Sequence, residues 1–416
     1  MMSRRAVLAM SSTAAAGIAL AAIAWLAARR LTTVELGFFF SFLSFGALIQ
    51  LCDFGLSYSA LQTAGHLVGS GRLGELPALA ARVSRWNLAT VCTASLAVFV
   101  AGWATFSATG AAGWQRPWMA YVLAVLMHQL TMPRMSLREG SGKVAQVWTV
   151  RLVYECIAGF ACLTALHFGA GLWSLAVFSA TRAAVSAAWL IANRLRVNDG
   201  EPVFSMERWM AEIWPFQWRM GVSGLSGFLI FRAFALIVMS EQGPIAAGEI
   251  GLASSLMNLL ITVSTAWPLS QAARYAALNA GGGTDELRHE FPKMLWASTA
   301  LAAVAAVGSS LVLWRAREMG IAVALRLPDA WTTAIVLCTA VIHHFVSCFA
   351  VFLRSQGREP LLWASVLGSI ATGLAVWLAA HYGTLRDVAI ANLILVSIGI
   401  PIVLSLFRPR WKLLAK

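Results

Sequence analysis

Long apolar stretches recur along the whole chain and are separated by short polar segments. A helix needs roughly 20 apolar residues to cross a bilayer, and about twelve stretches reach that length. They cover residues 6–28, 36–61, 86–106, 118–137, 147–167, 172–193, 212–239, 245–268, 294–314, 330–353, 361–380 and 386–407. Such continuous runs are not barrel strands, because barrel strands alternate apolar and polar residues. The pattern predicts an all-α polytopic membrane protein with about twelve transmembrane helices.

Composition and charge support a membrane protein. Hydrophobic residues make up 59 % of the chain and charged residues 12 %, against about 25 % charged residues in a soluble domain. The formal net charge is +13, but the basic residues are unevenly placed. With the N-terminus in the cytoplasm, about 22 Lys and Arg lie at cytoplasmic span ends and about 7 on the other side. This asymmetry predicts two cytoplasmic termini and basic segments that meet lipid headgroups, with no nucleic-acid partner.

The first stretch resembles a signal peptide, and Arg4-Arg5 hints at a twin-arginine signal. Its apolar part exceeds the length of a signal peptide and ends in Arg29-Arg30, which favours an uncleaved first span. The six cysteines all lie within predicted spans and lack metal-ligand spacing, so we expect no disulfide framework, metal or cofactor. They are Cys52, Cys92, Cys156, Cys162, Cys338 and Cys348.

Weak internal repeats suggest two halves. Residues 137–143 (LREGSGK) and 353–359 (LRSQGRE) share Leu-Arg at an offset of 216, and His128 and His344 share the same offset. Glu-Leu at 75–76 recurs at 286–287. Six spans in each half would insert both halves the same way round, which is a transporter layout with a central cavity. We expect an N-terminal six-helix lobe over 1–196, a cytoplasmic connector over 197–211 and a C-terminal six-helix lobe over 212–416.

The sequence gives little support for an enzymatic function. The predicted outward loops are short, and no Ser-His-Asp order, carboxylate pair or metal cluster stands out in the sequence. The triplet Asp53-Phe54-Gly55 matches the magnesium motif of protein kinases, but the Gly-rich loop, lysine and catalytic loop that such a site needs do not accompany it. The sequence therefore predicts that the protein is not an enzyme, and that Asp53 belongs to a membrane helix.

Ionisable residues inside spans are costly, and usually face a pathway, a wet cavity or a partner. Arg182 lies mid-span, so anion binding and a structural salt bridge are both open for it, as they are for Arg219. Arg232 is nearer the far interface, where a structural role is favoured. Arg151 and Glu155 are four residues apart on one helical face and can pair, so a structural ion pair is predicted, with gating or ion coupling as the alternative.

Three further groups are candidates for gating or ion coupling. Asp53 lies in the cytoplasmic third of the second span and either holds local structure or belongs to a gate. His128 and His344 lie at matching positions in the two halves. Each is either a neutral, hydrogen-bonded core residue or a proton-handling group.

Residues 35–65 (ELGFFFSFLSFGALIQLCDFGLSYSALQTAG) resemble the second helix of Wzx-type polysaccharide flippases. Residues 215–234 and 243–256 (GPIAAGEIGLASSL) resemble their seventh and eighth helices. These flippases handle O-antigen or exopolysaccharide and belong to the multidrug/oligosaccharidyl-lipid/polysaccharide exporter superfamily. In lipid II flippases the first helix carries arginine, whereas here it is Ala-rich, which argues against a peptidoglycan substrate.

The resemblance implies a flippase in the bacterial inner membrane that moves a polyprenyl-pyrophosphate-linked oligosaccharide from the cytoplasmic to the periplasmic leaflet by alternating access. Cavity arginines would meet the pyrophosphate, a role that Arg219 fits by motif and Arg182 by depth, with Arg232 as a further candidate. Implied partners are the lipid-linked oligosaccharide, membrane lipids, a polysaccharide polymerase and a chain-length regulator. The alternatives are a cation-coupled drug antiporter of the same superfamily and a non-transporting subunit of an export complex.

Overall fold

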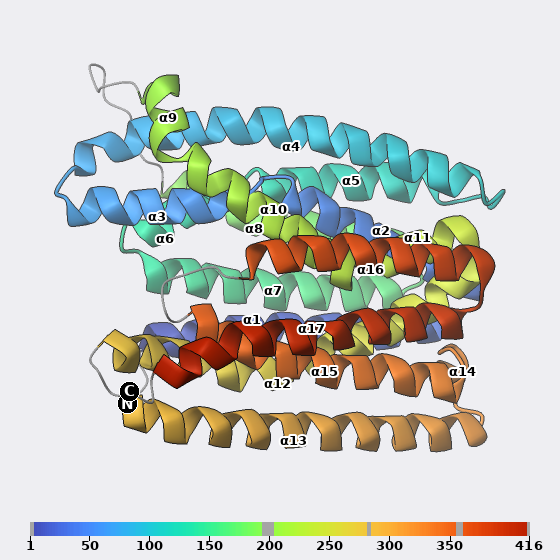
Figure 1. Cartoon of the computed structure of the whole chain (residues 1–416). Coiled ribbons are helices and arrows are strands. Elements are labelled where there is room, and N and C mark those ends of the chain that lie inside the picture. The colour runs from blue at the N-terminus through green and yellow to red at the C-terminus, as the bar shows by residue number, and fades with distance from the viewer. Residues whose placement is uncertain (1–3, 194–203, 281–283, 355–360, 414–416) are drawn as a thin grey trace. The chain divides into compact units, whose positions relative to one another are not determined.

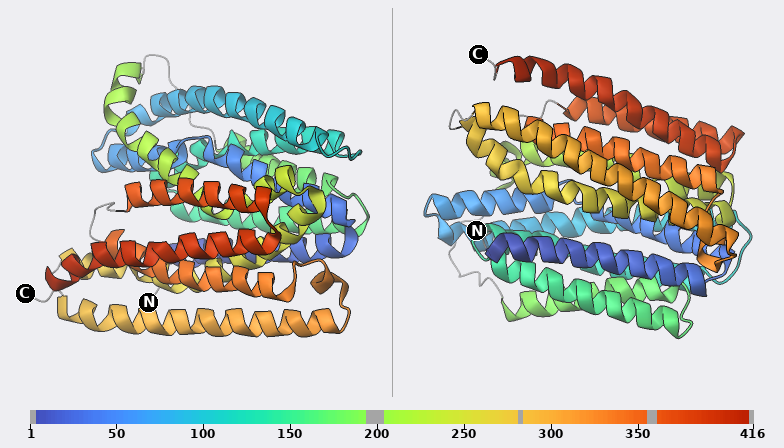
Figure 2. Two further views of the ribbon diagram at one scale, coloured as in Figure 1. Left: turned by 45° about the vertical axis from the view of Figure 1, so that its right-hand side comes forward. Right: turned by 90° about the horizontal axis from the view of Figure 1, so that it is seen from below.

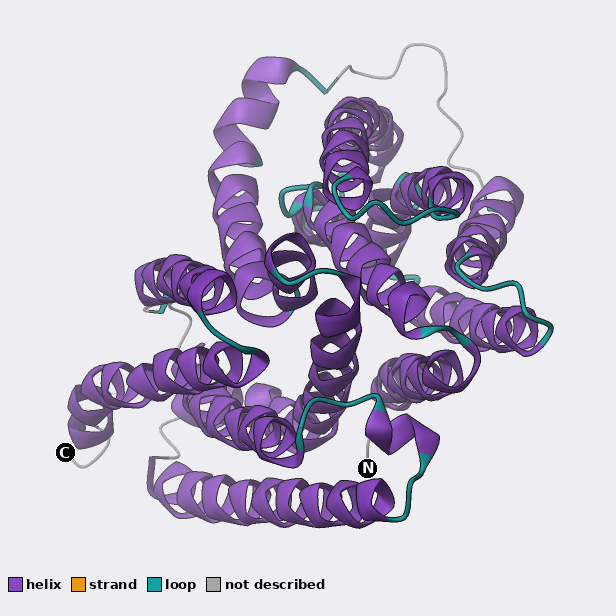
Figure 3. Ribbon diagram, turned by 90° about the vertical axis from the view of Figure 1, so that its right-hand side faces the viewer, coloured by secondary structure: helices purple, strands orange, loops and turns teal. Residues whose placement is uncertain are grey.

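The computed structural model describes residues 4–193, 204–280, 284–354 and 361–413. Every secondary-structure element in these ranges is a helix (Figure 3), which confirms the predicted all-α class. The chain forms two compact units, Met1–Phe228 and Leu229–Lys416, which we call the N-terminal lobe and the C-terminal lobe. Within each lobe, long helices run alongside one another (Figures 1 and 2).

The N-terminal lobe contains helices α1 to α9, the short 3₁₀-helix η1 and most of α10. They are α1 (Arg4–Arg30), α2 (Thr33–Leu51), α3 (Leu56–Gly69), η1 (Leu73–Glu75), α4 (Leu76–Ser107), α5 (Gln115–Gln129), α6 (Met132–Gly140), α7 (Val144–His167), α8 (Trp173–Ala192), α9 (Met206–Glu212) and α10 (Trp214–Phe231). The C-terminal lobe contains α11 (Phe234–Glu241), α12 (Pro244–Ala280), α13 (Thr284–Glu318), α14 (Ala322–Leu325), α15 (Ala330–Arg354), α16 (Leu362–Tyr382) and α17 (Leu385–Leu413).

Each of the twelve predicted spans falls on one helix or on a pair of consecutive helices. Among the described residues, nine helices are long and apolar enough to cross a membrane, and the α10–α11 pair raises that number to ten. The remaining two predicted spans coincide with α1 and with the α5–α6 pair. The protein is therefore a multi-pass membrane protein.

The same pairs of spans pack together in the two lobes. In the N-terminal lobe, α5 packs on α8, α7 on α8, α2 on α5 and α4 on α5. At the equivalent positions of the C-terminal lobe, α15 packs on α17, α16 on α17, α12 on α15 and α13 on α15. The internal topologies therefore repeat, as the sequence offsets suggested, although part of the motif 353–359 lies outside the described residues.

The division between the lobes lies between Phe228 and Leu229, so α9 and most of α10 group with the N-terminal lobe. The sequence placed the connector at 197–211, of which residues 197–203 lie outside the described ranges. From Phe204 onward, this segment packs on α3 and α4 through Phe204, Trp209 and Ile213, which are all buried.

The helix of the second span is interrupted, which corrects the continuous helix expected there. Cys52 to Gly55 separate α2 from α3, and both Phe54 (φ 49°) and Gly55 (φ 78°) have left-handed backbone angles. Glycine adopts this conformation without steric cost, but phenylalanine does not. Local turn chemistry therefore overrides the apolar continuity that suggested a single helix.

Arginines concentrate at the end of the N-terminal lobe where α3 and α6 end and α4 begins, and we call this the basic end. The opposite end is filled by a cluster of aromatic rings from α2, α4, α5 and Trp114, which directly precedes α5. Neighbouring ring centroids in this aromatic cluster lie 4.9–6.3 Å apart, and its members are Phe38, Phe42, Phe45, Phe106, Trp114, Trp118 and Tyr121. Gly46 and Gly102 make room for it, because a Cβ at either position would overlap the ring of Tyr121 or Trp118.

Candidate functional site

A buried ion pair lies halfway along α7 and α8. An Nη atom of Arg182 donates to Glu155 Oε1 at 2.7 Å, and the Glu155 residue is only 6 % exposed. Both residues lie about ten positions from either end of their helices, which is about 15 Å at 1.5 Å per residue. Neither side chain can reach the membrane interface easily from that depth, so each depends on the other for charge compensation.

Aromatic rings complete the surroundings of Arg182. Its guanidinium carbon lies 5.3 Å from the ring centroids of Tyr154 and of Phe178, which is within cation–π range. Its Nε is buried and has no hydrogen-bond partner among the described residues. Arg182 is thus held by one carboxylate and two rings, and its buried Nε donor has no partner among the described residues.

The predicted Arg151–Glu155 pair is wrong. Arg151 instead lies 3.1 Å from Glu139 Oε2, across the turn between α6 and α7. Trp148 donates through Nε1 to Glu139 Oε1 at 2.9 Å, and its ring lies below the Arg151 guanidinium at 4.5 Å. Spacing along α7 made the pair sterically feasible, but α6 and α8 bring closer partners to both residues.

His128 of α5 lies in the same region of the lobe. It is 3 % exposed, and its ring meets Tyr154 edge-on at 5.4 Å between centroids. Its Nδ1 has no hydrogen-bond partner in the described part of the chain. With Glu139, Arg151, Glu155 and Arg182, His128 forms a set of ionisable groups on α5 to α8, which we call the N-lobe charge cluster.

Sequence reasoning missed Glu139, because it lies at the end of a predicted span rather than inside one. The signal that could have found it is Gly142, whose φ of 93° marks the tight turn that returns the chain toward α6. A turn at that point brings Glu139 opposite the first two turns of α7, where Arg151 lies.

Asp53 caps α3. Its Oδ1 accepts from the Gly55 N–H at 2.8 Å, and its Oδ2 accepts from the Ser57 N–H at 3.1 Å and from the Ser57 hydroxyl at 2.6 Å. These bonds satisfy donors that the start of a helix leaves unpaired. Of the two roles predicted for Asp53, the geometry describes the local structural one, and a gating role remains a proposal.

Two glycines bring α10 against the break between α2 and α3. A Cβ at Gly221 would lie 2.9 Å from Phe54 Cα, and one at Gly224 would lie 3.2 Å from Leu51. Gly221 and Gly224 therefore allow close packing of α10 on this break. The chain breaks after Phe231, before α11.

The structure places the other predicted arginines at exposed positions. Arg219 lies on α10 with its guanidinium carbon 5.7 Å from the Trp218 ring centroid. Arg232 lies in the break between α10 and α11 and is exposed. Neither belongs to the N-lobe charge cluster.

His344 is a hydrogen-bonded core residue of the C-terminal lobe. Its Nε2 lies 3.0 Å from the Ser298 hydroxyl and 3.5 Å from the Cys348 sulfur, and the residue is fully buried. These contacts join α13 to α15. A proton-handling role for His344, like one for His128, remains a proposal.

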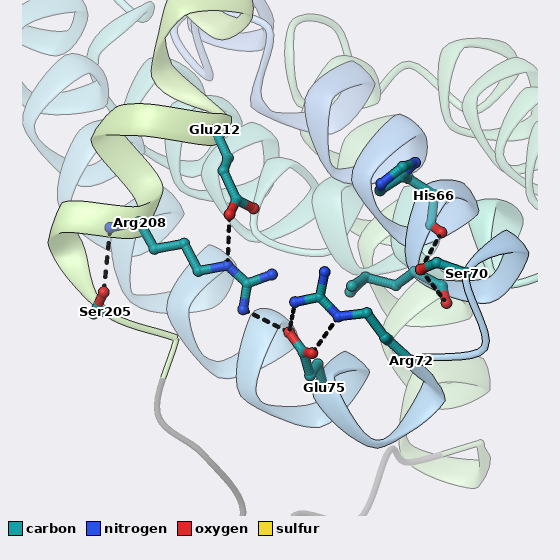
Figure 4. Close-up of polar contacts among 8 residues, drawn as sticks. His66, Ser70, Arg72, Glu75, Ser205, Arg208 and Glu212 are labelled. Carbon is teal, nitrogen blue, oxygen red and sulfur yellow. Dashed lines mark hydrogen bonds and ion pairs between the residues drawn. The ribbon is translucent and has the colours of Figure 1, made fainter.

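A second polar network, at the basic end, was not predicted. Arg208 of α9 bridges Glu75 at 2.5 Å and Glu212 at 2.9 Å, and Arg72 makes a forked contact with the same Glu75 (Figure 4). Hydrogen bonds to Glu212 and Glu75 raise the pKa of the Arg208 guanidinium. Arg208 and Glu75 are 133 residues apart, so no local pattern reveals the contact.

No protein-family profile and no curated protein sequence matches the chain. Solved structures do match it over nearly its whole length. A multidrug resistance MATE family transporter of the MOP superfamily in an inward-facing conformation has 14 % identity, coverage of 99 % of both chains and a TM-score of 0.73. The outward-facing conformation of such a transporter has 12 % identity, coverage of 100 % and 97 % and a TM-score of 0.62.

A third match is a MOP superfamily transporter from Pyrococcus furiosus, whose binding pocket is described as having reverse polarity that suggests a different function. It has 14 % identity, coverage of 99 % of this chain and 96 % of the other, and a TM-score of 0.61. Identities this low establish the fold alone. The chain therefore has the two-lobed fold of these MOP superfamily transporters.

Proposed function

We propose that this protein is an alternating-access transporter that flips a polyprenyl-pyrophosphate-linked oligosaccharide from the cytoplasmic to the periplasmic leaflet. The fold supports a transporter, because solved proteins with it include inward-facing and outward-facing conformations. The excess of basic residues at the basic end supports a cytoplasmic location for that end. The choice of substrate is supported by different residues, namely the charged residues embedded in the spans.

The support for this substrate class is that the embedded carboxylates of the N-terminal lobe are already engaged by other residues. Glu155 and Glu139 are each paired with an arginine, and Asp53 is engaged by its own turn. None of these three is left to take up a cation by itself. Arg182 retains an Nε without a partner among the described residues, and Arg219 is exposed, so among these groups of the N-terminal lobe cationic donors outnumber free carboxylates.

Such donors suit a pyrophosphate. Moving a charged headgroup and several sugars through about 30 Å of hydrocarbon is prohibitive without a polar, cationic path. Guanidinium groups stay protonated and bind phosphate oxygens in a forked geometry. In this mechanism Arg182 and Arg219 bind the headgroup, and sugars and lipid tail follow as access alternates between the two leaflets.

A cation-coupled drug antiporter is the second candidate, because two of the structures described above are multidrug resistance transporters. It predicts an embedded carboxylate whose loss abolishes export. Under this mechanism Glu155 exchanges Arg182 for a cation during transport. The two candidates therefore assign opposite roles to the same ion pair.

Reconstitution into liposomes tests both. A fluorescent lipid-linked oligosaccharide should become accessible to a membrane-impermeant quencher when wild-type protein is present, and Arg219→Gln should slow this process. Arg288→Gln, which removes an exposed charge from α13, should not slow it. Absence of flipping together with proton- or sodium-driven efflux of a cationic dye would favour the antiporter, and absence of both would favour a non-transporting subunit.

A further inference from the structure

Arg138 is buried at the basic end of the N-terminal lobe without a partner in the described chain. The residue is 6 % exposed, yet no hydrogen bond or ion pair of its guanidinium is found among the described residues. The adjacent Glu139 is engaged by Trp148 and Arg151. Buried charges in proteins are normally paired, so a guanidinium that has no acid among the described residues points to a bound anion.

Three more arginines lie on the same two helices of the basic end, one on α6 and two on α4, and these helices pack together. Arg134, one turn earlier on α6, donates through Nε to the Ser84 hydroxyl of α4 at 2.8 Å. Arg82 and Arg85 flank Ser84 on α4, and Arg82 donates through Nε to the Phe204 carbonyl at 3.3 Å. No carboxylate of the described chain pairs with any of these arginines. Within the described part of the chain, the group therefore presents several guanidinium donors and no compensating acid.

Two apolar stripes lead from these arginines along the lobe. On α4, Leu88, Leu96 and Val100 follow Arg85 at helical spacing, and on α5, Met119, Leu123 and Met127 precede Arg134 at the same spacing. These six side chains are between 46 % and 64 % exposed, and α4 packs beside α5. Each stripe thus ends in an arginine at the basic end. This arrangement places a cationic group at one end of a surface suited to hydrocarbon chains.

We propose that Arg82, Arg85, Arg134 and Arg138 form a binding site for the phosphate headgroup of a membrane lipid, with its chains along the stripes of α4 and α5. A phosphate bound to Arg138 would supply a counter-charge that no described residue supplies, and the forked guanidinium matches its oxygens. The site shares no residue with the N-lobe charge cluster, although Arg138 precedes Glu139 on α6, and it does not depend on transport.

Thermal unfolding of the purified chain in neutral detergent tests the site. Phosphatidylglycerol at about 100 times its dissociation constant should raise the melting temperature of wild type by about 5 °C, since it binds the folded state. Arg138→Gln should lose this shift, Arg138→Lys should retain part of it, and the matched control Arg288→Gln should keep it. Without lipid, Arg138→Met should be at least as stable as wild type, because it removes a buried charge that no described residue pairs with.

Two further probes separate the sources of the phosphate. A polyprenyl diphosphate that stabilises wild type more than phosphatidylglycerol does would assign the site to a lipid diphosphate. Inorganic pyrophosphate at matched ionic strength should give a smaller shift than either lipid, because it lacks chains for the stripes. The proposal is overturned if no lipid stabilises wild type, if Arg138→Gln responds as wild type does, or if inorganic pyrophosphate acts as well as the lipids. Because flipping is not measured, failure here leaves the proposed function standing, and the reverse also holds.

Discussion

Replacing Glu155 by Gln tests the N-lobe charge cluster directly. The substitution preserves shape but leaves the Arg182 guanidinium without its acid, in a site where the two side chains are 19 % and 8 % exposed. Removing one partner of a buried pair costs about 3–5 kcal/mol, because the remaining charge is uncompensated. The same cost is expected for Arg182→Met, which leaves the Glu155 carboxylate alone.

The double variant Glu155→Met/Arg182→Met should behave differently. It removes both charges together, and the new side chains can pack between the Tyr154 and Phe178 rings. Its stability is expected within about 2 kcal/mol of wild type, although the single losses sum to about 6–10 kcal/mol. Such non-additivity would show that the charges compensate each other, as the 2.7 Å contact implies.

Unfolding free energies in mixed dodecyl maltoside and sodium dodecyl sulfate micelles, followed by far-ultraviolet circular dichroism, provide the measurement. Arg315→Gln is the matched control, because its pair with Glu318 is exposed and should contribute at most about 1 kcal/mol. If Glu155→Gln unfolds like wild type, or if the two single losses simply add, the pair does not compensate charge and the reasoning is refuted. A stable double variant that no longer flips lipid would indicate that Arg182 binds substrate. A stable and active double variant would indicate that the ion pair has only a structural role.

Three more outcomes follow from other parts of the structure. Gly140→Val should destabilise the N-terminal lobe by about 1–3 kcal/mol in the same unfolding assay, because a Cβ there would overlap the Leu61 carbonyl on α3, and unchanged stability would contradict that packing. Asp53→Ala should cost about 1–2 kcal/mol through loss of the α3 cap, and Asp53→Asn should cost less; equal losses would disprove a cap made by the side-chain oxygen. Partial burial alone would raise the pKa of Asp329, but its hydrogen bonds from Thr332 and its ion pair with Arg386 outweigh burial and lower that pKa. Its contribution to stability should therefore be present above about pH 4 and lost as the pH falls through its lowered pKa, and Asp329→Asn should abolish that part of the acid dependence in unfolding measured from pH 6 to pH 2.

The sequence predicted the helices well because their signal is local. Each span needs only an uninterrupted apolar run, and lipid forces its backbone into helix. The topological repeat also showed in the sequence, since His128 and His344 lie at matching positions in the two lobes. The break at Asp53 was missed, because its neighbours Phe54 and Leu56 are apolar and hide a turn that only Gly55 reveals.

The partners of the charged residues could not be read from spacing. Arg151 and Glu155 are compatible on one helix, but their actual partners come from α6 and α8, and tertiary packing decides between them. Arg208 finds Glu75 across 133 residues for the same reason. The depth of a charged residue within its span was a better guide to a buried contact than sequence spacing was, because Arg182 lies at the middle of its span.

The aromatic cluster gives the N-terminal lobe unequal resistance to local opening. Seven large rings from α2, α4 and α5 interlock at one end, and Phe106 and Trp118 are completely buried there. Amides in the helical turns beneath these rings should exchange with deuterium only when the whole lobe unfolds. At the basic end, the short helix α9 is held by the buried Trp209 and by ion pairs that salt and water can loosen, so its amides should exchange before those of the aromatic end. The lobe is accordingly most fixed at the end where it carries least charge.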